Sequence, residues 1–120
     1  MLFRSVGQGF ITSKPDLTQG LVTALSRAVR WMYKNPADAA LISQKLLPDT
    51  PKEALTETVQ RLIKSRIVNE TGRITRERYD GLVQWLVTTK QLDQPVRFED
   101  AVTTQFTDAA YSKLGPGVDA

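Results

Sequence analysis

Four carboxylates could be imagined as a general acid and a general base: Glu53, Glu57, Glu77 and Asp80. A pair of carboxylates can divide proton donation and proton removal between them when both face one substrate. No cluster of further polar residues accompanies these four, and each is expected in the first turn or on an exposed face of a helix. The sequence therefore favours helix capping and solvation over catalysis for all of them.

Thiolate and imidazole chemistry is excluded, because the 120 residues include no cysteine and no histidine. Zinc sites built on those ligands and Cys–His or Ser–His nucleophilic pairs cannot form. We therefore expect no catalytic residue, no metal ligand and no cofactor, and the sequence assigns no ligand-binding residue.

Three shorter patterns are weaker than their usual functional forms. The segment Gly7-Gln8-Gly9 lacks the third glycine of a phosphate-binding loop. Trp31 and Tyr33 could form a ligand-stacking wall, but an aromatic pair at the end of a helix is more typical of a core or its rim. The connection around Thr71-Gly72-Arg73 is a turn of about nine residues, too long for a helix-turn-helix motif.

The first long helix is expected between Ser13 and Asn35-Pro36. Ser13 is the predicted N-cap, and Pro15 fits the first turn, where a missing N–H costs no hydrogen bond. Pro36 ends the helix because it disfavours the α conformation for the residue before it. Apolar residues recur at helical spacing along this segment, which predicts an amphipathic helix that needs a large surface to cover it. They are Leu17, Leu21, Val22, Ala24, Leu25, Ala28, Val29 and Met32.

The remaining elements are predicted from caps and periodicity. Val6–Thr12 is expected to be a short strand without an obvious partner. Asn35-Pro36 opens a helix to Leu46, and Thr50-Pro51-Lys52-Glu53 is a capping box for a helix to Ser65. Thr75 caps a helix from Arg76 to Lys90, with Gly81 inside it at a cost of about 1 kcal/mol. Extended residues 96–98 and a last helix, Thr103–Leu114, follow. The fold expected for the isolated chain is mainly α, with four to five helices and one short N-terminal strand.

Charge and hydropathy define which partners the chain could have. The net charge is +3, and the basic residues are dispersed rather than clustered, so an ordinary solvated surface is favoured over a nucleic-acid interface. No apolar run reaches membrane-spanning length, and no export signal is visible. We expect no nucleic-acid partner and no membrane-spanning helix.

Several segments occur in an order and at spacings that are typical of one protein family. They are Lys14-Pro15-Asp16-Leu17, Arg30-Trp31, Asn35-Pro36-Ala37-Asp38-Ala39-Ala40, residues 74–92, Pro95-Val96 and Thr104-Gln105-Phe106. Together they resemble the C-terminal part of substrate-binding proteins of ABC importers, in the branch that handles nitrate, sulfonates, taurine and thiamine-pyrimidine precursors. The resemblance covers residues 6–112 and rests on spacing and order more than on any invariant motif.

The resemblance implies a type II periplasmic-binding-protein fold, an α/β fold with a solute held between two lobes. It also implies a periplasmic or extracytoplasmic location for the parent protein and two partners, a small-molecule solute and an ABC permease. The strands of the first lobe and the whole second lobe have no counterpart in this sequence, so no binding residue is carried over and the solute cannot be named.

The domain organisation follows from the same reading. Residues 1–5 are expected to be non-native, because Leu2-Phe3-Arg4-Ser5 is one translation of a common sequencing adaptor. Residues 6–114 are expected to belong to a lobe of a binding protein, and residues 115–120 to form a disordered tail. A fragment of this kind would expose apolar surface and self-associate or become molten.

Two other functions stay open. A self-contained helical interaction or regulatory module would form a stable monomer or dimer. An enzyme is the third reading; the thiamine-precursor synthases that share the fold use a histidine, which this chain does not have.

Overall fold

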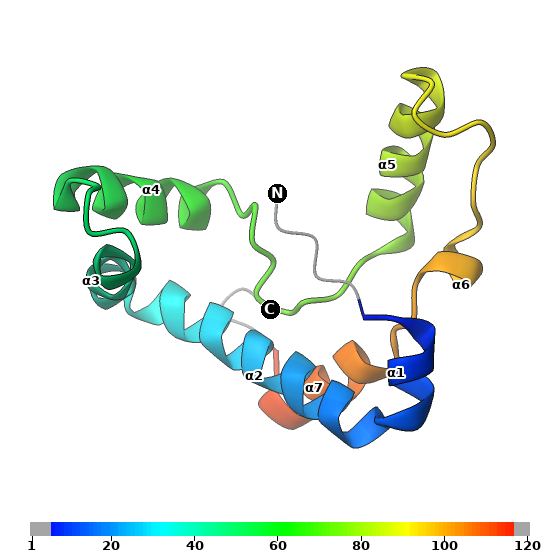
Figure 1. Cartoon of the computed structure of the whole chain (residues 1–120), viewed down its shortest axis with the longest axis horizontal. Helices are drawn as coiled ribbons and strands as arrows, with labels where there is room; N and C mark the ends of the chain where they lie inside the picture. Colours follow the sequence, from blue (N-terminus) through cyan, green and yellow to red (C-terminus); the bar gives the residue numbers. More distant parts are fainter. Residues whose placement is uncertain (1–5, 117–120) are drawn as a thin grey trace.

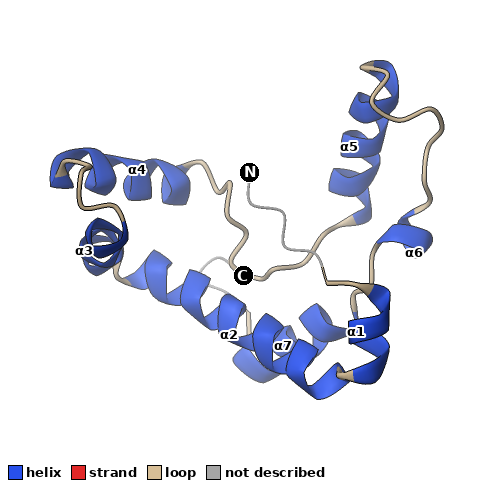
Figure 2. Ribbon diagram, in the orientation of Figure 1, coloured by secondary structure: helices blue, strands red, loops and turns tan. Residues whose placement is uncertain are grey.

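The computed structural model describes residues 6–116, and within that range the chain is helical without a strand (Figure 2). The helices are α1 (Gln8–Ser13), α2 (Pro15–Lys34), α3 (Pro36–Leu46), α4 (Lys52–Lys64), α5 (Arg76–Thr88), α6 (Phe98–Ala101) and α7 (Gln105–Leu114). The prediction of a mainly α chain is confirmed. Residues 1–5 and 117–120 lie outside the described range, so the expectations for the non-native N-terminus and for the end of the tail stay predictions.

The predicted N-terminal strand is wrong, because residues 8–13 form α1 instead. Gly7 has an extended conformation, with φ −61° and ψ 143°, and serves as the N-cap residue. Its carbonyl oxygen accepts from the backbone N–H groups of Phe10 and Ile11 at 2.9 and 3.1 Å. A lone strand would leave its backbone groups unpaired, whereas a helical turn satisfies them locally. The absence of a partner strand therefore outweighs the β propensity of this segment.

The long helix α2 begins one residue later than expected, so the predicted Ser13 cap is wrong. Ser13 is the last residue of α1, and Lys14 is the N-cap of α2 without a side-chain capping bond. Pro15 occupies the first turn, where its missing N–H leaves no donor unpaired. The end agrees with the sequence, since Asn35 leaves the helical conformation and Pro36 follows it.

The other helix starts divide into correct and incorrect predictions. Pro36 begins α3 as expected, and the Thr75 side chain accepts from the Arg78 N–H at the start of α5. The capping box before α4 is wrong, because Pro51 is the N-cap residue and no side chain caps this helix. Near the C-terminus, α6 begins at Phe98, where an extended segment was expected, and α7 begins at Gln105 rather than Thr103.

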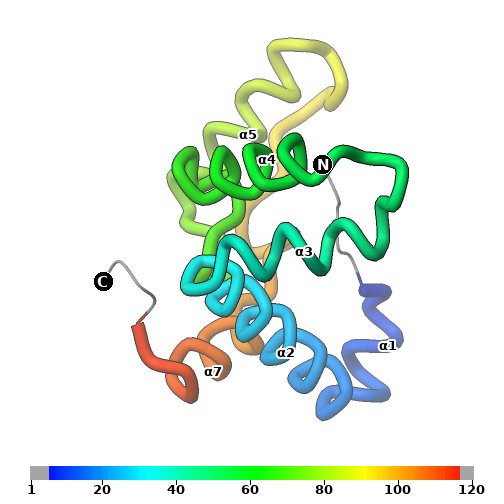
Figure 3. Tube along the Cα trace, turned by 90° about the vertical axis from the view of Figure 1, so that its left-hand side faces the viewer, coloured from blue at the N-terminus to red at the C-terminus, as the bar shows by residue number. Residues whose placement is uncertain are grey.

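The helices pack in separate pairs rather than around one common core (Figures 1 and 3). Helices α3 and α4 contact each other through Ala39, Ala40 and Val59, with Met32 and Ile63 packed against them. Helix α7 lies along α2 and buries Phe106 and Ala110. Helix α5 stands apart from α4 and contacts α6 (Figure 1).

This arrangement is open. The radius of gyration is 16.5 Å, whereas a compact chain of 120 residues has about 13.6 Å. The solvent-accessible surface is 9075 Å², against about 6,500 Å² for a compact monomer of the same mass. Among the described residues no large side chain is fully buried. The helices therefore leave much of their apolar surface in contact with solvent.

None of the helices in residues 6–116 has both the length and the apolar character to cross a bilayer, in agreement with the sequence.

Candidate functional site

The four carboxylates that could have formed an acid/base pair are not brought together. Glu53 and Glu57 lie on α4, whereas Glu77 and Asp80 lie on α5, on the opposite side of the molecule (Figure 1). All four are exposed. In residues 6–116 no three histidine, cysteine or acidic side chains gather as a metal site would require. The acid/base interpretation of these residues has no geometric support.

The glycine pair and the aromatic pair also have structural roles. Gly7 precedes α1 and Gly9 lies inside it, so they belong to a six-residue helix rather than to a loop that could hold phosphate. Tyr33 donates its hydroxyl to the Val68 carbonyl oxygen at 2.7 Å, whereas Trp31 is 41 % exposed. Residues two apart point to different sides of a helix, so Trp31 and Tyr33 do not form one stacking wall.

A polar cluster surrounds Asn69, in the connection between α4 and α5. We call residues 68–75 the Asn69 loop. The Asn69 side chain donates to the Arg73 carbonyl oxygen at 2.7 Å and accepts from the backbone N–H and the hydroxyl of Thr71 at 2.9 and 2.8 Å. An asparagine side chain that bonds its own backbone in this way fixes a turn. Sequence reasoning identified this turn but not Asn69 as its organiser.

Three cavities of about 460, 380 and 230 Å³ adjoin the Asn69 loop, and Asn69 lines each of them. The largest lies between the loop and α7, and the second between the loop, Tyr33 and the start of α5. The smallest is the most apolar and lies against α2, where Val22, Leu25 and Val29 line it. Three cavities thus share Asn69 as a lining residue.

The charged side chains around the largest cavity are paired with one another. Arg73 Nη2 lies 2.9 Å from Asp108 Oδ1, and the Arg73 guanidinium lies 4.9 Å from the centre of the Tyr111 ring. Asp108 Oδ1 is buried and makes no aligned hydrogen bond, so the ion pair with Arg73 is its polar contact, while the side chain as a whole is 43 % exposed. Ion pairing and cation–π contact both use Arg73 to dock the loop on α7.

Arg30 connects α2 to the same region. It donates to the carbonyl oxygens of Leu114 and Gly115 at 2.7 Å each, and to that of Glu70 at 3.4 Å. The carbonyl groups of Leu114 and Gly115 lie at the end of α7 and have no partner within the helix, so the Arg30 cation supplies their donors. Glu70 itself is buried and lines the second cavity with Arg66 and Arg78.

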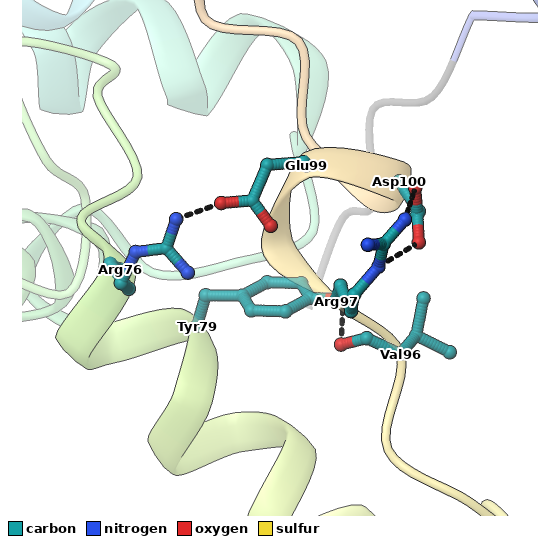
Figure 4. Close-up of polar contacts among 6 residues, drawn as sticks. All are labelled: Arg76, Tyr79, Val96, Arg97, Glu99 and Asp100. Carbon is teal, nitrogen blue, oxygen red and sulfur yellow. Dashed lines mark hydrogen bonds and ion pairs between the residues drawn. The ribbon is translucent and has the colours of Figure 1, made fainter.

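A second polar cluster joins α5 to α6 (Figure 4). Arg76 pairs with Glu99 and lies over the Phe98 ring, 5.1 Å from its centre. The Tyr79 ring meets Phe98 edge-on, with the ring centres 5.4 Å apart, and its hydroxyl donates to the Val96 carbonyl oxygen at 3.1 Å. Arg97 binds Asp100 through two hydrogen bonds.

The ion pairs of this cluster change the acidity of their members. The hydrogen bond from Arg76 lowers the pKa of Glu99, and Glu99 in turn raises the pKa of Arg76. The hydrogen bond to Asp100 raises the pKa of Arg97. These pairs are exposed, so they contribute little to stability. Arg76–Glu99 joins α5 to α6, whereas Arg97–Asp100 lies within the first turn of α6.

Comparison with known proteins identifies no family for the chain: no family model matches it, and neither do curated proteins or solved structures. The geometry of the described residues therefore carries what is proposed below, together with the resemblance in the sequence.

Proposed function

We propose that this chain is the C-terminal part of an extracytoplasmic solute-binding protein, which delivers a small anionic or heteroaromatic solute to an ABC importer. The sequence motifs behind the resemblance fall at helix boundaries. Pro15 starts α2, Pro36 starts α3, and Gln105 starts α7. A shared order of helix starts is what a common fold would require, and this agreement supports the proposal.

The observation that carries the proposal is the apolar surface that the helices leave uncovered. Leu17 and Leu21 of α2 are 62 % and 48 % exposed, and Trp85 of α5 is 54 % exposed. Monomeric proteins rarely expose large contiguous apolar patches. Helices that flank a sheet in an α/β protein need such faces, because the sheet buries them. The open arrangement is what helices evolved to cover another layer would adopt without it.

The solute would bind to the complete parent protein rather than to this chain. Sulfonate, nitrate, taurine, pyrimidine precursors and aromatic carboxylates all fit the resemblance, and no described residue is assigned to contact them. In the Asn69 loop, Arg73 is paired with Asp108 of α7, and the Glu70 carbonyl oxygen accepts from Arg30 of α2. We therefore propose a supporting role for this chain in solute binding, with the ligand contacts made elsewhere in the parent.

The test is to recover the genomic reading frame upstream of Val6. The proposal expects a long continuous frame that encodes a first lobe, a second lobe and an export signal. The complete protein should then show a thermal shift with one member of a panel of sulfonates, nitrate, taurine and pyrimidines, while the 120-residue chain should show none. A native start codon at Met1 with regulatory sequence before it would contradict the proposal.

A self-contained helical interaction module is the second candidate, and the purely helical character of residues 6–116 favours it. It predicts a stable, cooperatively unfolding chain that needs no further segment. If its partner were a nucleic acid, the affinity would fall steeply with salt concentration. Urea unfolding of the 120-residue chain separates the two candidates, because a self-contained module should unfold in one cooperative transition. A titration with duplex and single-stranded DNA at two salt concentrations tests for a nucleic-acid partner.

A further inference from the structure

Helix α2 buries its polar side and exposes part of its apolar side. Its buried residues are Thr18 and Ser26, on the side where α7 and the Asn69 loop pack. The exposed apolar residues follow a separate line along the helix, which we call the α2 seam. The α2 seam consists of Leu17, Leu21, Ala24, Ala28 and Trp31.

The spacing of the α2 seam is that of a helix–helix contact. Its residues are separated by four, three, four and three positions, the a/d pattern of a heptad. The wider part of the apolar stripe, with Val22, Leu25 and Val29, is already half-buried and lines the cavity against the Asn69 loop.

We propose that the α2 seam pairs with the α2 seam of a second copy of this chain, in antiparallel orientation with the two Ala24 residues facing each other. This inference concerns the 120-residue chain and does not use the proposed function. In this register Leu21 faces Ala28 of the second copy and Leu17 faces Trp31. Large residues then meet small ones near the centre, as close packing of two helices requires.

The parallel alternative packs less well. It would set Trp31 against Trp31 and leave Ala24 and Ala28 facing themselves, so the helices could not approach evenly. Antiparallel pairing also opposes the two helix dipoles and brings Lys34 of one copy toward Asp16 of the other, at the two ends of α2. Charge and side-chain volume therefore favour the same orientation.

The available surface is large enough for such a dimer. The chain exposes about 2,600 Å² more than a compact monomer of its mass. A stable protein–protein interface removes about 800 Å² from each partner. The excess over the whole chain is thus larger than the area that one such interface would remove.

Sedimentation velocity over a concentration series tests the dimer. We expect the unsubstituted chain to dimerise and Leu21→Glu to weaken the dimer by about tenfold or more. The matched control is Ile67→Glu, which places the same charge at a residue 72 % exposed in the connection before the Asn69 loop. Circular dichroism of both variants should show unchanged helix content, because both sites are on the surface.

Cysteine cross-linking tests the orientation, since the chain has no cysteine of its own. Ala24→Cys should form a disulfide-linked dimer on oxidation. Leu17→Cys should not link to itself, because the two sites lie about 21 Å apart along the helix axes. It should link to Trp31→Cys when the two variants are mixed.

Three results would overturn the proposal. A chain that stays monomeric at all concentrations has no seam pairing. A dimer that Ile67→Glu weakens as much as Leu21→Glu uses another surface. Self-linking of Leu17→Cys faster than that of Ala24→Cys would show a parallel dimer.

Discussion

Arg30 of α2 donates from Nη1 to the carbonyl oxygen of Leu114 at 2.7 Å, and so caps the last turn of α7. The same guanidinium donates to Gly115 and, more weakly, to Glu70. One side chain thereby joins α2, α7 and the Asn69 loop, three segments that are far apart in the sequence.

Replacement of Arg30 by methionine should destabilise the chain by about 2–3 kcal/mol, since it leaves helix-end carbonyl groups without their charged donor. The matched control is Arg27→Met, one turn earlier on α2, where the side chain is exposed. Urea unfolding followed by circular dichroism measures both. Equal, small effects of the two substitutions would show that the Arg30 contacts do not stabilise the packing of α7.

Thr75→Ala should cost about 1 kcal/mol, because it removes the hydroxyl that accepts from Arg78 N–H at the start of α5. Thr50→Ala is the informative comparison. The sequence predicted Thr50 as part of a capping box, but the structure shows no side-chain cap on α4, so this substitution should change stability little. If Thr50→Ala lowered the free energy of unfolding as much as Thr75→Ala, the result would support the predicted capping box at α4.

Two glycines should respond to alanine with opposite signs. Gly72 has φ +68°, a conformation that alanine adopts only with strain, so Gly72→Ala should destabilise the Asn69 loop by about 1 kcal/mol. Gly81 lies inside α5 with open space where a Cβ would be placed, so Gly81→Ala should stabilise by up to about 1 kcal/mol. Thermal unfolding of both variants provides the measurement; a loss of stability in Gly81→Ala would show that α5 contacts another surface there.

The pH dependence of the contact between α5 and α6 follows from the lowered pKa of Glu99. The pKa of Glu99 is lower in the folded chain than in the unfolded chain. The ion pair therefore stabilises the fold fully at pH values above the unfolded-state pKa, and this stabilisation is lost as the pH falls through the folded-state pKa. Carbon NMR of the Glu99 carboxyl group should show a pKa below the ordinary glutamate range. In Arg76→Gln that pKa should rise toward the ordinary value, whereas in Arg61→Gln on α4 it should stay unchanged.

Much of the helical content followed from local sequence. Pro36 at the start of α3, Thr75 before α5 and the Asn35-Pro36 stop are local signals, and the structure has a helix boundary at each of them. Where prediction failed, competing local bonds decided. Gly7 caps a short helix in place of a strand, and Pro51 rather than Thr50 precedes α4.

The sequence by itself determined that the chain is helical, that it has no thiolate or imidazole chemistry, and that α2 is amphipathic, since periodicity and composition are local properties. Only the tertiary structure decided which part of the α2 stripe is covered. It also showed that Arg30 of α2 caps the end of α7 and contacts the Asn69 loop. These Arg30 contacts join residues 40 to 85 positions apart, and spacing along a chain does not specify which distant carbonyl group or helix face a side chain will meet.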